Sequence, residues 1–193
     1  MALDAGQALL LVRATARASA VILAGNLLVA ARRLTAGGQG RAVARALHAG
    51  TPEPSALRAL RRLDVCVFVA FIVSHTIHFI CVTLLIVATR GGRIDARAAD
   101  ALLVAAGLLF YLACAAVLHV KRRPASGWPR PSDRRIEVWT LTAIWLAFFQ
   151  AYVSRPLQWW LFPALAIVLL YALARFVSAS LRSRDFPIPM RTP

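Results

Sequence analysis

Two histidines stand in the stretch "SHTIHFICVTLLIV", which is otherwise apolar. A neutral imidazole can bind haem iron, relay a proton or hydrogen-bond a neighbouring helix. At a spacing of three residues, His75 and His78 would lie on neighbouring faces of one helix, ~60° apart. An ionisable group deep in a membrane is costly and marks a functional site by default, so this pair is the first candidate for chemistry. Hydrogen bonding between packed helices is the alternative interpretation.

The composition indicates a membrane around these histidines. The 193 residues are 60% hydrophobic, with a mean hydropathy of +0.66, and the apolar residues come in long blocks. A helix needs about 20 residues to cross the hydrocarbon, where every backbone polar group must be satisfied internally. We therefore predict an all-α, polytopic transmembrane helical bundle, in which about five blocks form helices, approximately at 8–31, 65–89, 101–120, 136–154 and 157–178.

The flanks of these blocks refine the domain plan. Arg13 and Arg17 lie inside the first block, and the start "MALD" is acidic, which argues against a cleaved signal peptide. Asp64 is the only charged residue between Arg62 and Arg90. Only two residues, 155 and 156, separate the last two blocks, which predicts an antiparallel hairpin. We predict one transmembrane domain over 1–181 and a disordered cytoplasmic tail over 182–193.

The net charge of +15 has a distribution that predicts topology. Seventeen basic residues fall in segments 32–62, 121–135 and 175–193, and four fall in the loops on the opposite side. This positive-inside pattern predicts an outside N-terminus and a cytoplasmic C-terminus in the cell membrane, either an inner or a plasma membrane. The short basic stretches "RAVARALH" and "SALRALRR" are expected to lie on the lipid surface. The expected partner of the positive charge is membrane lipid, not nucleic acid.

Familiar catalytic motifs are absent from the sequence. It contains no Walker-type loop, GxGxxG, HExxH or GxSxG. The three cysteines lie in predicted spans without a CxxC pair, and we expect them to be buried small hydrophobes. We assign no catalytic residue, so any chemistry must come from polar groups within the membrane.

The segment "RRLDVCVFVAFIVSHTIHF", residues 61–79, resembles the second helix of bacterial ferric-reductase-like transmembrane proteins. That family includes the haem-bearing membrane subunit of methionine sulfoxide reductase systems, and one branch carries a Ser-His-x-x-His motif, matched here by Ser74, His75 and His78. The resemblance implies an oxidoreductase membrane subunit that transfers electrons through b haem. His75 or His78 would bind the haem iron, and a redox partner protein or a quinol would supply the electrons.

The sequence departs from the family where the next helix opens. The family has Leu-His at the step where this chain has Ile136 and Glu137, so an expected haem ligand is missing. Gln150 lies 13 residues further on, about 20 Å deeper, which levels it with the two histidines. Glutamine is a poor iron ligand and a good hydrogen-bond partner. A cofactor-free structural or assembly protein related to the family is therefore the alternative to haem-based electron transfer.

Three further polar residues complete the candidate set. His119 ends the third block at the level of Glu137 and could pair with it, although Lys121 and Arg122 are closer competitors. Arg13 and Arg17 share one helix face because they are four residues apart. That face would hold a haem propionate or a quinone head group if it looks into the bundle, and lipid phosphate if it looks outward.

Overall fold

The computed structural model describes residues 4–38, 55–89, 98–122, 131–153 and 161–182. These residues form five helices and no strand: α1 (Ala5–Gly38), α3 (Ser55–Thr89), α4 (Ala98–Arg122), α5 (Pro131–Val153) and α6 (Leu161–Arg182). Among the described residues, α1, α3, α4 and α6 are long and apolar enough to cross a membrane. The all-α, multi-pass architecture is therefore confirmed. The proposed span of α5, which opens with several charged residues, stays a prediction.

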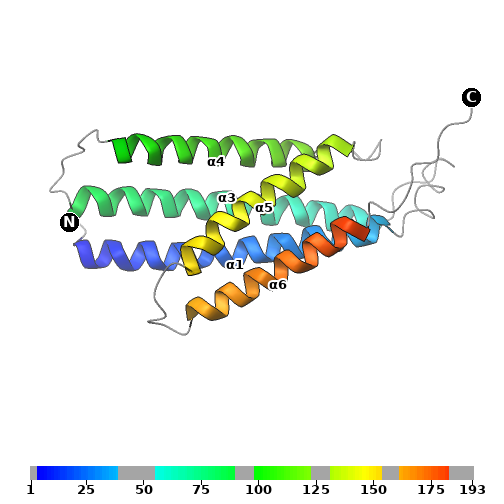
Figure 1. Ribbon diagram of the computed structural model, residues 1–193, viewed down its shortest axis with the longest axis horizontal. Coiled ribbons are helices and arrows are strands. Elements are labelled where there is room, and N and C mark those ends of the chain that lie inside the picture. The colour runs from blue at the N-terminus through cyan, green and yellow to red at the C-terminus, as the bar shows by residue number, and fades with distance from the viewer. Residues whose placement is uncertain (1–3, 39–54, 90–97, 123–130, 154–160, 183–193) are drawn as a thin grey trace, which may run out of the picture.

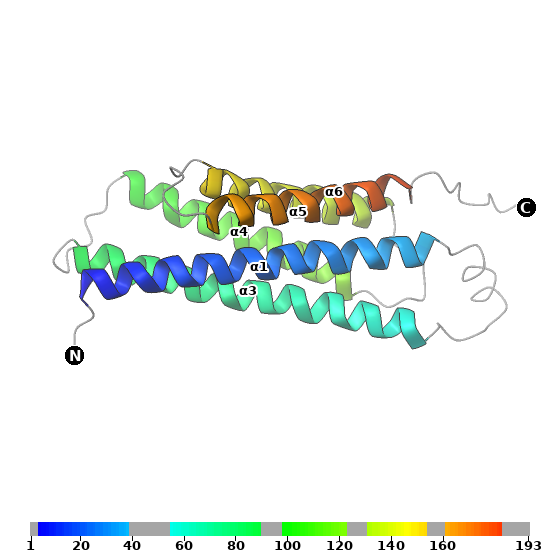
Figure 2. The ribbon, with the colours of Figure 1, turned by 90° about the horizontal axis from the view of Figure 1, so that it is seen from below.

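Successive helices of the described residues run in opposite directions along the long axis of the bundle (Figure 1). α1 packs along α3 and α6, and α4 packs against α3 and α5. The antiparallel pairing of α5 and α6 is confirmed, and Figure 2 shows both in a layer over α1. Two hydrogen bonds tie this pair: Trp145 Nε1 donates to the Leu169 carbonyl at 2.8 Å, and Arg134 donates to the Ser180 carbonyl at 2.7 Å. The connection at 154–160 and the tail after 182 lie outside the described residues.

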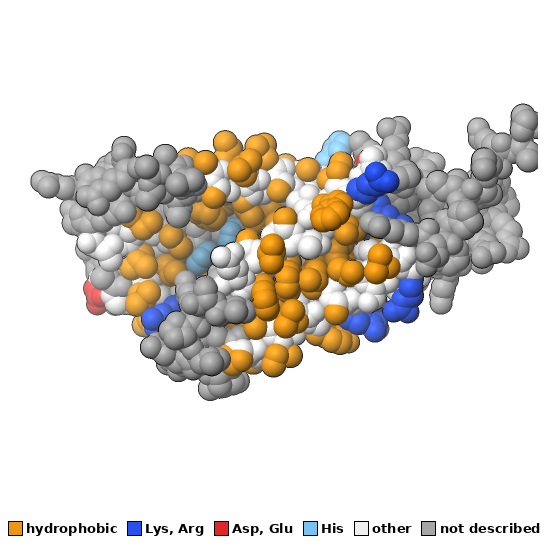
Figure 3. Space-filling model, in the orientation of Figure 1, with side chains coloured by type: hydrophobic (Ala, Val, Ile, Leu, Met, Phe, Trp, Pro, Cys, Tyr) orange, Lys and Arg blue, Asp and Glu red, His pale blue; other side chains and the backbone are white. Residues whose placement is uncertain are grey.

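Apolar side chains fill the centre of the bundle and also cover much of its outside. The fully buried large ones come from every helix: Leu23, Leu27, Phe68, Phe71, Val117, Leu141, Leu169 and Phe176. Figure 3 shows apolar side chains spread along the outer surfaces of the helices. Such a surface suits lipid tails, and helix association then depends on close packing and polar contacts between helices.

Two of the helices are longer than their apolar blocks predicted. α1 has 34 residues and α3 has 35, which corresponds to ~51 and ~52 Å of helix against ~30 Å of hydrocarbon. The stretch "SALRALRR" forms the first two turns of α3 and continues directly into the apolar block, and its contact with the lipid surface stays a prediction. Its alanines, leucines and arginines are strong helix formers and continue the helix beyond the apolar block. The stretch "RAVARALH" lies outside the described residues.

The cysteines divide between the inside and the outside of the bundle. Cys81 and Cys114 are buried, as expected. Cys66 is exposed, and our expectation of its burial is wrong because it lies on the outward face of α3. An exposed cysteine in a span must be removed before any cysteine-labelling experiment.

The orientation of the bundle in the membrane is our first testable prediction. Because most basic residues fall on one side, single cysteines at Ala36, Ser126 and Ser183 should be protected from an impermeant reagent added outside whole cells. A cysteine at Gly91 should react. The measurement uses a cysteine-free background, and permeabilised cells serve as the control in which all four sites react. Labelling at Ser126 in intact cells would contradict the five-span topology.

Candidate functional site

His75 lies in an aromatic cluster at the junction of α3, α4 and α5. Its ring centroid is 4.4 Å from that of Phe110, 5.1 Å from Phe148, 5.3 Å from Phe79 and 5.9 Å from Phe71. Its Nδ1 atom is buried and has no hydrogen-bond partner among the described residues. Aromatic rings from α3, α4 and α5 thus pack around the imidazole, and its Nδ1 atom is left without a hydrogen bond to them.

His78 lies on the α1 side of the same helix. Its Nδ1 atom is 3.0 Å from Thr15 Oγ1, and Thr15 Oγ1 is 2.8 Å from the Leu11 carbonyl. A His78 tautomer protonated at Nδ1 satisfies both contacts, because the threonine hydroxyl then accepts from the imidazole and donates to the carbonyl. One turn away, Ser19 Oγ and Ser74 Oγ are 3.0 Å apart. Polar contacts therefore join α1 to α3 at this level.

The polar residues expected around the histidines differ in their exposure. Gln150 is exposed and makes no hydrogen bond to either imidazole. Arg13 is exposed and Arg17 is half-buried, at the level where Thr15 meets His78. Sequence reasoning missed Thr15, although a threonine between two arginines on the neighbouring apolar block was a usable signal.

The described histidines do not supply a two-histidine haem site. Axial ligands approach iron from opposite sides of the macrocycle, whereas His75 and His78 project from one helix with ring centroids only 5.6 Å apart. His119 lies at the far end of α4 and is exposed. Four phenyl rings surround the His75 imidazole, so a macrocycle on that nitrogen would have to displace them. Within the described residues, no group of three or more His, Cys, Asp or Glu side chains could hold a metal ion.

A second polar centre lies at the other end of the bundle and joins four helices. We call it the ionic ring: Arg33 of α1, Asp64 of α3, Lys121 of α4 and Glu137 of α5. Arg33 Nε is 3.0 Å from Asp64 Oδ2, and Lys121 Nζ is 2.6 Å from Asp64 Oδ1. Glu137 lies 2.5 Å from Arg33 Nη2 and 2.9 Å from Lys121 Nζ. Charges of opposite sign therefore alternate around a closed ring with no net charge.

The ionic ring is almost completely enclosed. The exposed fractions of its side chains are 17% for Arg33, 1% for Asp64, 0% for Lys121 and 5% for Glu137. Burying a single charge costs several kcal/mol, and each member here has two opposite charges to compensate it. Lys121 Nζ also lies 5.5 Å from the centroid of the Phe68 ring. The geometry of the ionic ring fits a contact that holds the ends of four helices in register.

The ring explains the residue found where a histidine was expected. Glu137 pairs with Lys121, one of the two competitors named from the sequence, while Arg122 and His119 are exposed. In the sequence Asp64 is only the single charge of its block, and nothing there links it to Glu137. The up-and-down order of the helices offered the signal, since it brings both acids to the same end of the bundle as Arg33 and Lys121.

Comparison with known proteins adds no relative: no protein-family model, curated protein or solved structure matches this chain.

Proposed function

We propose that this chain is a cofactor-free structural or assembly protein of a cell membrane, here the inner membrane of a bacterium. The observation that carries the proposal is that several interior polar groups contact one another between helices. His78 meets Thr15, Ser74 meets Ser19, and the four members of the ionic ring neutralise one another. Polar contacts of this kind hold helices together where lipid supplies no hydrophobic driving force.

The partner of such a protein would be another membrane protein, and lipid would cover the remaining apolar surface. The long exposed apolar faces of α4 and α6 are compatible with both. This assignment makes His75 and His78 packing residues, and Arg13 and Arg17 contacts to the outer lipid phosphates.

A second candidate function is electron transfer through b haem, with a redox partner protein or a quinol as the electron source. The buried Nδ1 atom of His75, which has no described hydrogen-bond partner, favours it. If haem binds, it would supply the redox chemistry, and His75 is the residue that would hold it. The candidate needs a second ligand from outside the described histidines, or an iron with one protein ligand.

The two functions assign different roles to His78. A double-mutant cycle measures the coupling between His78 and Thr15. We expect Thr15→Val and His78→Ala to be coupled by about 0.6–1.7 kcal/mol in unfolding by SDS from mixed micelles, because each substitution removes the same interhelical hydrogen bond. Leu11→Ala is the matched control, because it keeps Thr15, His78 and the helix. Additive effects of the two substitutions would contradict the packing role.

An absorption spectrum of the same preparations tests the haem candidate. The chain, produced in cells supplied with a haem precursor, should purify without a Soret band in either redox state. A band that shifts on dithionite reduction and is lost in His75→Ala, but kept in His119→Ala, would overturn the cofactor-free proposal and establish the second candidate.

A further inference from the structure

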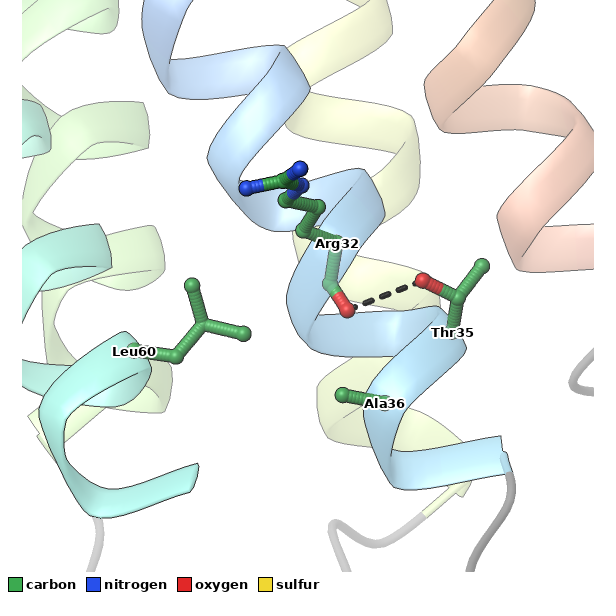
Figure 4. Close-up of a pocket in the computed structure, with 4 residues that line it drawn as sticks. All are labelled: Arg32, Thr35, Ala36 and Leu60. Atoms are coloured by element: carbon green, nitrogen blue, oxygen red, sulfur yellow. Dashed lines mark hydrogen bonds between the residues drawn. The ribbon is translucent and has the colours of Figure 1, made fainter. Parts of the chain in front are cut away.

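A recess of about 280 Å³ lies between the end of α1 and the start of α3. Arg32, Thr35 and Ala36 of α1 line it, and Leu60 of α3 faces them. Figure 4 shows the Arg32 guanidinium in the space beside α1, with the Leu60 side chain reaching toward α1 below it. The recess thus combines one cation with an apolar wall. We call it the Arg32 recess.

The neighbouring residues Arg32 and Arg33 of α1 differ in whether a carboxylate balances their charge. Arg33 is mostly buried and faces the carboxylates of Asp64 and Glu137 in the ionic ring. Arg32 is exposed, and among the described residues no carboxylate lies within ion-pair distance of it. Thr35 Oγ1 lies 2.9 Å from the Arg32 carbonyl and 3.1 Å from that of Ala31, so its proton stays within α1. Arg32 therefore leaves the recess with an uncompensated positive charge, which favours an anion.

The position of the recess along the bundle matches a lipid headgroup. Leu60 lies one turn before Asp64, and Arg32 directly follows the apolar block that ends near Ala31. Both sides of the recess thus lie where the apolar spans give way to charged residues. The charge distribution predicts that this end faces the cytoplasm, where the leaflet surface is negative and basic pockets between helices bind headgroups.

We propose that the Arg32 recess binds an anionic phospholipid, with the Arg32 guanidinium on the phosphate. A guanidinium donates two parallel hydrogen bonds to phosphate oxygens, which a single ammonium cannot match. Ala36 and Leu60 contact the glycerol and the first acyl carbons, and the exposed Leu63 continues the apolar surface toward the bilayer. Free phosphate offers the charge without the apolar part, so the lipid is the better ligand. The site is independent of the proposed function, because it uses neither histidine nor the ionic ring.

Native mass spectrometry of the full chain tests the site with defined probes. The delipidated protein is titrated with dioleoylphosphatidylglycerol, with dioleoylphosphatidylcholine and with inorganic phosphate. We expect one phosphatidylglycerol molecule to remain bound, phosphatidylcholine to bind more weakly, and millimolar phosphate not to displace the lipid. Arg32→Gln should weaken phosphatidylglycerol binding about fivefold, as expected for one arginine at an anionic surface.

Two variants make the result specific to this recess. Arg62→Gln removes the same charge from the same end of the bundle, is exposed and does not line the recess, so its binding should equal that of the original chain. Arg32→Lys should keep the preference for phosphatidylglycerol with partial loss of affinity. Equal losses for Arg32→Gln and Arg62→Gln would indicate only diffuse attraction and would overturn the proposal. Displacement of the lipid by phosphate would identify an anion site without lipid specificity and would also overturn it.

Discussion

Replacing Lys121 with methionine should lower the free energy of unfolding by about 3–5 kcal/mol, the cost of breaking a buried ion pair by removing one partner. The substitution keeps the length of the side chain but leaves the Asp64 and Glu137 carboxylates buried with only Arg33 to compensate them. Unfolding by SDS from mixed micelles, followed by far-UV circular dichroism, measures the loss.

A second substitution separates charge balance from packing. Adding Asp64→Asn to Lys121→Met restores neutrality, because Arg33 and Glu137 remain as one pair. We expect this double variant to recover more than half of the loss. Arg122→Met is the matched control, since it removes an exposed charge from the next position of α4 and should change stability by less than ~0.5 kcal/mol. A double variant less stable than Lys121→Met alone would show that the ring depends on each side chain and not on its charge balance.

Truncating Phe71 to alanine should have the second largest effect, about 3 kcal/mol of lost stability. Its ring is fully buried, and the ring centroids of Phe148 and Phe110 lie 5.6 and 6.0 Å away on α5 and α4. The cost in a membrane comes from lost contacts and from the cavity left behind, since lipid tails cannot enter the packed centre. The same SDS titration provides the measurement.

A lipid-facing residue of the same helix controls for this prediction. Ile77 is 48% exposed on α3, so lipid tails replace the contacts that Ile77→Ala removes. We expect its effect to remain below ~1 kcal/mol. Similar losses for Phe71→Ala and Ile77→Ala would contradict a packed aromatic centre and would suggest a loosely associated bundle.

The five helices of the described residues could be predicted from the sequence, whereas their ends could not. Long apolar blocks determine which segments suit lipid, and all five blocks coincide with helices. The helix ends depend on backbone propensity, which does not change where the apolar block stops. α3 therefore begins at Ser55, ten residues before the predicted start of its span at Val65.

The sequence could predict how far along the bundle each site residue lies, but not toward which neighbouring helix its side chain points. Counting residues along helices correctly brought His119 and Glu137 to one end and the histidine pair to another level. The same arithmetic contains no information about rotation around each helix axis. It therefore selected Gln150, which is exposed, and missed Thr15, which meets His78 on α1. Only the packing of helix against helix decides between residues at equal depth.

The ionic ring also constrains how the chain is assembled during synthesis. Arg33 and Asp64 emerge first and can form a neutral pair as soon as α3 has been made. Lys121 then enters with α4 as an unmatched cation, and Glu137 arrives last to balance it. The helix that carries Glu137 opens with three further charged residues, Asp133, Arg134 and Arg135. A chain that ended before α5 would thus retain a buried lysine without its second carboxylate, so the ring ties the retention of α5 to the three charges made before it.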